Sequence, residues 1–310
     1  MLQLFPKKIK NYLCGLKNVR IPVFFYALAA MLFWGMSFIW TSILLNYYQP
    51  VTIILIRLII SSVFLFAVIF AMKAFVPVRK KDLPLLLLSA VFNPFLYFLL
   101  ENYGLKETSP AVAAVIIATI PVFSPITGYL AFRERLRWFN LAGILLSFAG
   151  IVIMLIRKDL SFTASPLGVA FLFGAVVAAL FYSVTLKSLS ARYTSLTIIS
   201  WQNLAGIFLF LPFFLAFEVK EAMVVPLNTS IVSSFLFLAI LASSLSYVFY
   251  VKSVKALGIS KANIFSNLIP VFTAVFSYFI LDESFTFQKT IGILVVIAGV
   301  VLSEINRRRD

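Results

Sequence analysis

The chain has 310 residues, of which 62% are hydrophobic and only 12% charged, with a formal net charge of +15 and a mean hydropathy of +1.05. So few charged side chains cannot cover the surface of a water-soluble domain of this size, and a soluble globular enzyme is therefore excluded. The sequence has no His and a single Cys, Cys14, which excludes His-based zinc sites, Ser–His triads and a disulfide framework.

Residues 1–21 form a basic leader. Leu13, Leu16 and Val19 recur at helical spacing among lysines and an arginine, a pattern typical of a segment lying on an anionic membrane surface. A cleavable signal peptide is the alternative interpretation. The apolar run that follows is too long for one, so we expect an uncleaved first span.

Apolar runs of about 20 residues follow one another through the rest of the chain, and each can cross a hydrocarbon core of roughly 30 Å as a helix. The runs are continuous and lack the alternation of barrel strands. We therefore predict an all-α polytopic membrane protein with ten transmembrane helices. The predicted spans are 22–45, 52–73, 83–103, 110–131, 138–156, 166–187, 195–217, 230–251, 261–281 and 287–305.

The ten spans divide into two repeats. The stretch IPVFSPITGYLAFRERL, from residue 120, returns as IPVFTAVFSYFILDESF from residue 269, an offset of 149 residues. A second match, with an offset of 145, aligns VTIILIRLI from residue 51 with LTIISWQNL from residue 196. We infer that one five-helix unit has been used twice. The predicted repeats are 22–156 and 166–305, joined by an external linker at 157–165 and followed by a basic tail at 306–310.

The basic residues predict the orientation of the spans. With a cytoplasmic N-terminus, twenty of the 26 Lys and Arg residues fall on the inner side, five on the outer side, and one, Arg57, within a span. Both termini are then cytoplasmic. Because five is an odd number, the second repeat enters the membrane inverted. The aligned turns agree, since Arg133–Arg137 is basic and inside while Asp282–Glu283 is acidic and outside.

Several short motifs, in order and in both halves, carry a family resemblance. They are Phe33–Phe38 in the first span, Arg57 in the second, Gly104–Ala111 with its counterpart Ala256–Ala262, the Pro-Val-Phe helix that ends in Glu, and the Gly-rich fifth and tenth spans. The chain resembles the drug/metabolite transporter superfamily, specifically its EamA-type ten-helix transporters, from about Phe24 to Glu304. The resemblance implies a carrier or exporter of small metabolites such as amino acids and their analogues.

Polar residues within the spans are the candidates for a solute pathway. Inverted repeats commonly place such a pathway between them, near the bilayer midplane. Aromatic residues near the same depth would supply apolar walls. The serines also suit inter-helix hydrogen bonds and the tryptophan suits packing, so both interpretations stay open. The candidates are Trp34, Ser37, Asn93, Tyr97, Tyr182, Ser246, Tyr247 and Asn267.

Three prolines are expected to interrupt spans. Pro121 and Pro270 are predicted to lie in mid-helix, and Pro94 follows Asn93 in the third span. A proline inside a helix frees a carbonyl one turn earlier, and in lipid that carbonyl must find a partner or line a cavity. The predicted kinks therefore shape the pathway, with passive bends as the alternative.

Two ionisable residues lie well inside spans. Arg57 and Glu101 are both predicted near the outer face, where pairing would lower the cost of their charges. We predict that they form an outer latch, while the aligned residues, Gln202 and Tyr250, form a neutral contact on the inner side. The resting carrier would then be closed outward. The alternative is that Arg57 snorkels to headgroups while Glu101 is solvated.

The sequence therefore predicts a membrane carrier that works by alternating access between inverted repeats, with export favoured. A non-transporting scaffold or receptor on the same bundle is the alternative. No HExxH, GxSxG or Walker A motif occurs, so no enzymatic activity, catalytic residue, metal or cofactor is expected. The expected partners are the lipid bilayer and a small-molecule substrate, without nucleic acid, and a monomer is favoured. The expected location is the plasma membrane or a bacterial inner membrane.

Overall fold

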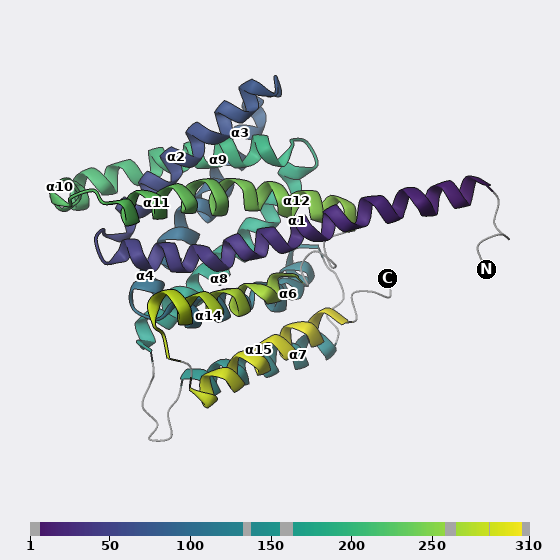
Figure 1. The fold of residues 1–310 in the computed structure, drawn as a ribbon. Coiled ribbons are helices and arrows are strands. Elements are labelled where there is room, and N and C mark those ends of the chain that lie inside the picture. Colours follow the sequence, from purple (N-terminus) through teal and green to yellow (C-terminus); the bar gives the residue numbers. More distant parts are fainter. Residues whose placement is uncertain (1–6, 133–137, 156–163, 258–264, 285, 306–310) are drawn as a thin grey trace.

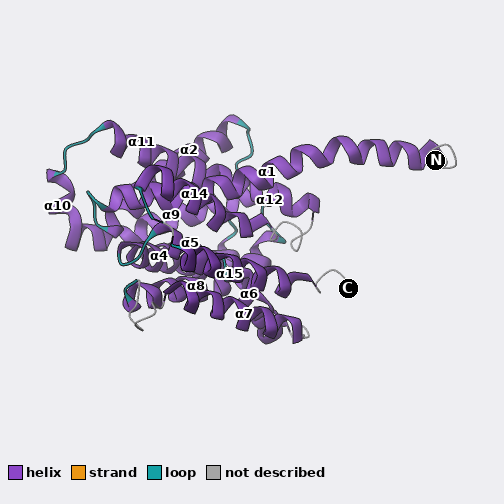
Figure 2. Ribbon diagram, turned by 60° about the horizontal axis from the view of Figure 1, so that its bottom comes forward, coloured by secondary structure: helices purple, strands orange, loops and turns teal. Residues whose placement is uncertain are grey.

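The computed structural model describes residues 7–132, 138–155, 164–257, 265–284 and 286–305. All regular secondary structure in these ranges is helical, and they contain no strand (Figure 2). The predicted all-α class is thereby confirmed. Several predicted features lie outside the described residues: the arginine cluster at 133–137, most of the linker at 157–165, most of the motif at 256–262, the first residues of the ninth span and the tail at 306–310.

Helices occupy all ten predicted spans. The first repeat contains α1 (Lys7–Leu45), α2 (Pro50–Ala71), η1 (Lys80–Asp82), α3 (Leu83–Ala90), η2 (Val91–Leu96), α4 (Tyr97–Lys106), α5 (Pro110–Ile117), α6 (Ile120–Phe132) and α7 (Trp138–Leu155). The second contains α8 (Pro166–Ser190), α9 (Ser195–Phe213), η3 (Phe214–Glu218), α10 (Val219–Val224), α11 (Thr229–Phe237), η4 (Leu238–Leu245), α12 (Ser246–Leu257), η5 (Phe265–Asn267), α14 (Leu268–Leu281) and α15 (Phe287–Ile305).

Length and apolar composition make this a polytopic membrane protein. Seven helical stretches of the described chain are long and apolar enough to cross a bilayer, and shorter apolar helices cover Phe265–Leu281 and Phe287–Leu302. The leader is not a separate element from Lys7 onward, because α1 runs without interruption to Leu45. The N-terminal part of α1 projects beyond the bundle (Figure 1).

The fifth spans of the two repeats reveal how the repeats are related. Helices α7 and α15 lie side by side (Figure 1) and touch through glycines. A Cβ at Gly150 would lie 2.8 Å from the carbonyl oxygen of Gly292, and one at Gly299 would lie 2.8 Å from that of Gly143. Early residues of one helix thus meet late residues of the other, so the two aligned helices run antiparallel.

The second spans of the two repeats, α2 and α9, also meet through equivalent contacts. A Cβ at Gly206 on α9 would lie 2.9 Å from the Leu58 side chain on α2, and Asn203 Nδ2 donates to Ser61 Oγ at 2.9 Å. With the offset of 145, Leu58 aligns with Asn203 and Ser61 aligns with Gly206, so the two contacts exchange under the repeat. The two repeats are therefore inverted relative to each other, as predicted.

The fourth and ninth spans are broken helices, but the breaks do not fall where the sequence predicted. Helix α5 ends at Ile117 and α6 begins at Ile120, so Pro121 is the second residue of a new helix. In the ninth span η5 gives way to α14, whose third residue is Pro270. The prediction that these two prolines lie in mid-helix is wrong. Proline fits the first helical turn, where its missing N–H has no intrahelical acceptor.

The third and eighth spans contain π-helical turns at their centres. In η2, Asn93 has the non-helical angles φ −148° and ψ 119° and precedes Pro94. In η4, Ser243 and Ser244 donate to carbonyls five residues earlier, at 3.1 and 3.0 Å. Pi-helical turns are frequent at functional sites. These two turns lie beside the cavity described next.

Candidate functional site

A small cavity lies between the repeats. Its volume is about 10 Å³, room for about one water molecule. The walls come from η2 and α4 of the first repeat, and from α8, α9, η4 and α12 of the second. The lining residues are Asn93, Phe98, Tyr182, Ile199, Gln202, Asn203, Ser243 and Tyr247.

Four residues singled out from the sequence meet at this cavity. Asn93, Tyr182 and Tyr247 were predicted pathway residues, whereas Gln202 was predicted to form the inner contact. Asn93 and Tyr247 both line the cavity, and the Tyr182 hydroxyl donates to Gln202 Oε1 at 3.3 Å. The wall thus combines amides and hydroxyls with aromatic rings, as sites for amphipathic small molecules do.

Trp34 extends this aromatic wall toward α1. Its ring lies 5.2 Å from that of Tyr247 in an edge-on arrangement and 5.3 Å from that of Tyr250. Its indole Nε1 donates to the carbonyl oxygen of Ala242 at 3.2 Å, which links the first span to η4. Trp34 therefore fixes one side of the cavity by contacts to two elements of the other repeat.

Other predicted pathway residues are not at the cavity. Ser37 Oγ donates to the Trp34 carbonyl at 2.7 Å, and Ser246 Oγ donates to that of Leu241 at 2.8 Å, so both hydroxyls serve their own helices. Tyr97 donates to Glu101 Oε1 at 2.8 Å. Asn267 is buried at the start of α14, and neither polar atom of its side chain has a hydrogen-bond partner.

Arg57 is buried next to the cavity, with 4% of its surface exposed. Its Nε donates to Ser243 Oγ, and its guanidinium carbon lies 3.9 Å from the centroid of the Phe98 ring. Within the described residues no ion pair of 4.0 Å or less joins Arg57 to Glu101, although Glu101 attracts Arg57 electrostatically. The predicted outer latch therefore stays a prediction for a state in which the two side chains approach.

The predicted inner partners have other contacts. Gln202 Nε2 donates to Ser89 Oγ at 2.7 Å, and Thr185 Oγ1 donates to the same oxygen at 3.1 Å. Tyr250 packs against Trp34. The amide of Gln202 thus ties α9 to α3 and, through Tyr182, to α8. The proposed Gln202–Tyr250 contact stays a prediction.

Three residues of the cavity wall were not predicted from the sequence: Phe98, Ile199 and Asn203. From the seventh span only Gln202 was singled out, as part of the inner contact, yet this span supplies three lining residues. One signal was available: Gln202 and Asn203 are consecutive amides inside an apolar span, where polar side chains face the bundle interior. The contacts of Asn203 with Ser61, and of Ser61 with Ser244 at 2.8 Å, continue this polar seam across both repeats.

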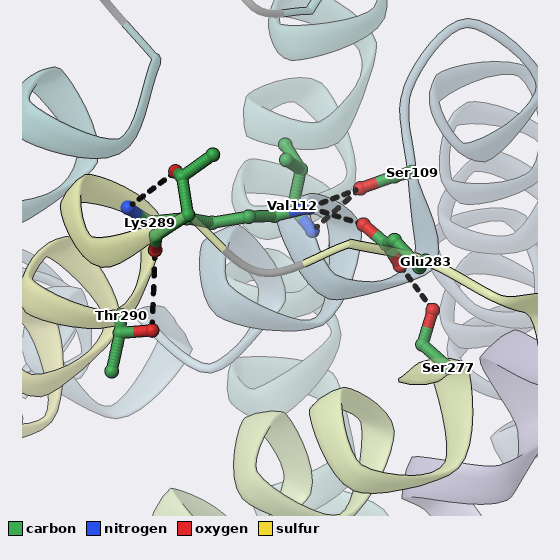
Figure 3. Close-up of polar contacts among 7 residues, drawn as sticks. Ser109, Val112, Ser277, Glu283, Lys289 and Thr290 are labelled. Carbon is green, nitrogen blue, oxygen red and sulfur yellow. Dashed lines mark hydrogen bonds and ion pairs between the residues drawn. The ribbon is translucent and has the colours of Figure 1, made fainter. Parts of the chain in front are cut away.

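A second polar cluster lies on the predicted outer side, at the start of α5 and between α14 and α15 (Figure 3). Lys289 Nζ forms an ion pair with Glu283 and donates to Ser109 Oγ at 3.4 Å, while Ser277 Oγ donates to Glu283. Burial alone would raise the pKa of Glu283, but hydrogen bonds from Lys289, Ser109 and Ser277 outweigh it and lower that pKa. The cluster therefore joins the two repeats through a carboxylate that stays charged.

An open groove of about 850 Å³ lies beside this cluster. Its walls carry both signs of charge, with Lys106 and Lys289 opposed by Glu107 and Glu283. The groove is much larger than the central cavity and is open to one side of the molecule. Along the chain that the structure describes, no three His, Cys, Asp or Glu side chains gather as metal ligands would.

Comparison of the sequence with known protein families identifies the family of this chain. The profile of the EamA-like transporter family matches residues 21–156 and again residues 166–305, nearly the whole chain. The chain belongs to the EamA-like transporter family. This EamA-like protein is therefore related to transporters of the drug/metabolite superfamily, and its place is the plasma membrane or a bacterial inner membrane.

Curated relatives agree with the family. An uncharacterized transporter of Bacillus subtilis, YetK, is 27% identical over 82% of this chain and 78% of its own. An uncharacterized inner membrane transporter of Salmonella typhimurium, YicL, is 28% identical over 74% of this chain and 76% of its own. A probable terminal-alkyne amino-acid exporter of Streptantibioticus cattleyicolor is 29% identical over 74% and 75%.

A known crystal structure shares the fold of this EamA-like protein. The two chains superpose with a TM-score of 0.69 at 18% identity, over 92% of this chain and 99% of the other. At this identity the likeness concerns the fold alone.

Proposed function

We propose that this protein is a carrier that exports small amphipathic metabolites, such as amino acids and their analogues, by alternating access. The observation that carries the proposal is the central cavity, because both repeats build it from amides, hydroxyls and aromatic rings. Inverted repeats give such a site two interconvertible surroundings, one open to each side of the membrane. The relative that is named an amino-acid exporter supports the same class of solute.

The cavity is too small for a metabolite, which fits a carrier closed around its site between two open states. A scaffold or receptor on the same bundle is the rival function, and an enzyme is not proposed. The discriminating experiment is movement of labelled amino acids and other metabolites in proteoliposomes. A carrier exchanges them across the membrane, whereas a scaffold moves none.

Two substitutions locate the pathway. Asn93→Leu should abolish transport because Asn93 lines the cavity. Asn267→Leu, outside the cavity wall, tests whether the pathway reaches the start of α14; it should abolish transport with little change in melting temperature, because Asn267 has no hydrogen-bond partner to lose. Ser190→Ala, at an exposed helix end, is the control and should transport normally. Normal transport by both asparagine variants would mean that the pathway lies elsewhere.

The orientation is tested separately. In a Cys14→Ser background, Ser284→Cys should react with an impermeant thiol reagent added outside intact cells, while Arg135→Cys should not react. The reverse pattern would overturn the proposed orientation with both termini in the cytoplasm.

A further inference from the structure

Arg57 has few partners for a buried charge. A guanidinium carries five N–H donors. In the part of the chain that the structure describes, the hydrogen bond from Nε to Ser243 accounts for one of them, and no carboxylate lies within 4.0 Å. Ionisable side chains inside a membrane bundle are expensive and usually mark a substrate or ion pathway. The two Nη nitrogens of Arg57 are the groups that call for an explanation.

The guanidinium is held in place beside the cavity. Phe98 supports one face of it at 3.9 Å, and Ser243 fixes its Nε. Phe98 and Ser243 both line the cavity, so the guanidinium borders the space in which a solute would lie. A planar fork fixed in this way is pre-organised for a carboxylate, which it binds through two parallel hydrogen bonds.

Glu101 supplies the opposite charge nearby. It lies one helical turn after Phe98 on α4, and its Oε1 accepts a hydrogen bond from the Tyr97 hydroxyl at 2.8 Å. Glu101 attracts Arg57 electrostatically without forming an ion pair with it in this state. A cation and an anion, each held by a hydrogen bond, therefore lie unpaired next to the part of the cavity wall that Phe98 forms.

We propose that Arg57 and Glu101 are the two charged ends of the solute site, Arg57 binding a carboxylate and Glu101 a protonated amine. This inference rests on the proposed carrier function and adds to it the recognition of a zwitterion. The aromatic rings of Phe98, Tyr182 and Tyr247 would pack against the apolar part of the solute. A solute with both charges neutralises both residues, whereas one with a single charge leaves the other residue unpaired and buried.

The test uses three probes that differ only in charge: L-phenylalanine, phenethylamine, which lacks the carboxylate, and 3-phenylpropanoate, which lacks the amine. Counterflow in proteoliposomes and thermal shift of the purified full-length protein measure transport and binding. Wild type should prefer phenylalanine to either analogue by about 10- to 100-fold, the worth of a charge-assisted contact.

The variants assign each charge to one residue. Arg57→Gln should lower the affinity for phenylalanine by a similar factor and leave that for phenethylamine unchanged. Glu101→Gln should lower the affinity for phenylalanine and leave that for 3-phenylpropanoate unchanged. Arg57→Lys keeps the positive charge but lacks the planar pair of donors. Its affinity for phenylalanine should lie between those of wild type and Arg57→Gln. Arg79→Gln, which removes an exposed arginine, is the control and should match wild type.

Two failures are distinguishable. If wild type binds the three probes with equal affinity, the proposed zwitterion recognition is wrong, even when a variant fails to fold. It is also wrong if Arg57→Gln folds and binds phenylalanine as tightly as wild type does. In both cases, transport of the probes would leave the carrier function standing. If wild-type liposomes move none of the three probes, the proposed amino-acid class of solute is wrong as well.

Discussion

The two repeats secure the start of their second span with a buried carboxylate, but they do so differently. On the predicted outer side, Glu218 at the end of η3 accepts hydrogen bonds from Val51 N at 3.2 Å, Thr52 N at 2.6 Å and Thr52 Oγ1 at 2.7 Å. On the predicted inner side, Asp82 of η1 accepts from Arg192 and, at 2.7 Å, from the Tyr193 hydroxyl, just before α9. One carboxylate binds mainly backbone, and the other binds side chains.

The difference follows from one aligned position. Thr194 is the N-cap of α9, and its side chain accepts a hydrogen bond from Thr197 N. The offset of 145 places Gln49 at the same position before α2, and Gln49 makes no capping hydrogen bond. The orphan N–H groups of α2 are therefore satisfied by Glu218, a residue of the other repeat, whose charge also suits a helix N-terminus. An inverted repeat thus keeps its geometry while the chemistry of its ends diverges.

The largest effect is expected for Glu218→Ala. This change leaves two buried backbone N–H groups and the Thr52 hydroxyl without their acceptor, which should cost about 3 kcal/mol of unfolding free energy. Thermal unfolding in detergent, compared with Glu221→Ala on the exposed surface of α10, measures the difference. A melting temperature equal to that of the control would show that water replaces the carboxylate and that the cap contributes little.

A smaller effect is expected for Asp82→Asn. The carboxylate is 1% exposed, but the Arg192 side chain is 53% exposed, so their attraction is screened and the loss of stability should be smaller than that caused by Glu218→Ala. Salt sharpens the contrast with Glu218. The destabilisation by Asp82→Asn should shrink between 0.05 and about 1 M NaCl, since the Debye length falls to about 3 Å. That by Glu218→Ala should stay constant, and equal salt dependence of the two would contradict the comparison.

The smallest effect is expected at the outer cluster, where a third carboxylate uses a lysine and two serines. Replacing Glu283 by Gln should lower the unfolding free energy at pH 7 by about 1 kcal/mol, the upper range for a partly exposed ion pair. The pKa of Glu283 is lowered from its ordinary value of 4.5, so its stabilising contribution is complete above pH 4.5 and is lost as the pH falls through the folded-state value.

Melting curves from pH 7 to pH 3.5 test whether the pKa of Glu283 is lowered. The gap between wild type and Glu283→Gln should stay constant down to about pH 5 and close only below the ordinary pKa. Lys289, Ser109 and Ser277 contact Glu283, and Lys106 and Glu107 line the adjoining groove, so all five groups bear on the result. A gap that already closes between pH 7 and pH 5 would mean that the pKa of Glu283 is raised instead.

The sequence was sufficient for features that depend on composition and periodicity. Ten apolar runs and two constant offsets predicted the helices and the inversion, because each run must be a helix in lipid whatever its neighbours are. The sequence was insufficient for features that depend on the exact residue at which a helix begins or ends. Counting residues places Pro121 in the middle of its span. The helix instead restarts at Ile120, after a turn at 118–119 in which Thr119 Oγ1 donates to the carbonyl oxygen of Ile116 at 2.6 Å.

Pairing between distant residues was also beyond the sequence. Nothing in the pattern distinguishes Ser243 from Glu101 as the partner of Arg57, because the choice depends on how η4 packs against α2 and α4. The polarity of Gln202 and Asn203 indicated an inward-facing side of the seventh span, but not that this side meets Asn93 across the repeat boundary. Such contacts follow from the arrangement of the two units and not from either unit alone.

The seam between α7 and α15 has a bearing on how such a chain arises. Gly143 faces Gly299 and Gly150 faces Gly292, and the offset of 149 exchanges the two contacts. A surface that meets an equivalent copy of itself in this way is isologous, the form of interface found between identical subunits related by a two-fold axis. The seam is thus what a homodimer of single five-helix chains, one inserted in each direction, would need. Because the two halves belong to one chain, residues at equivalent positions need not be identical, and Gln49 and Thr194 differ.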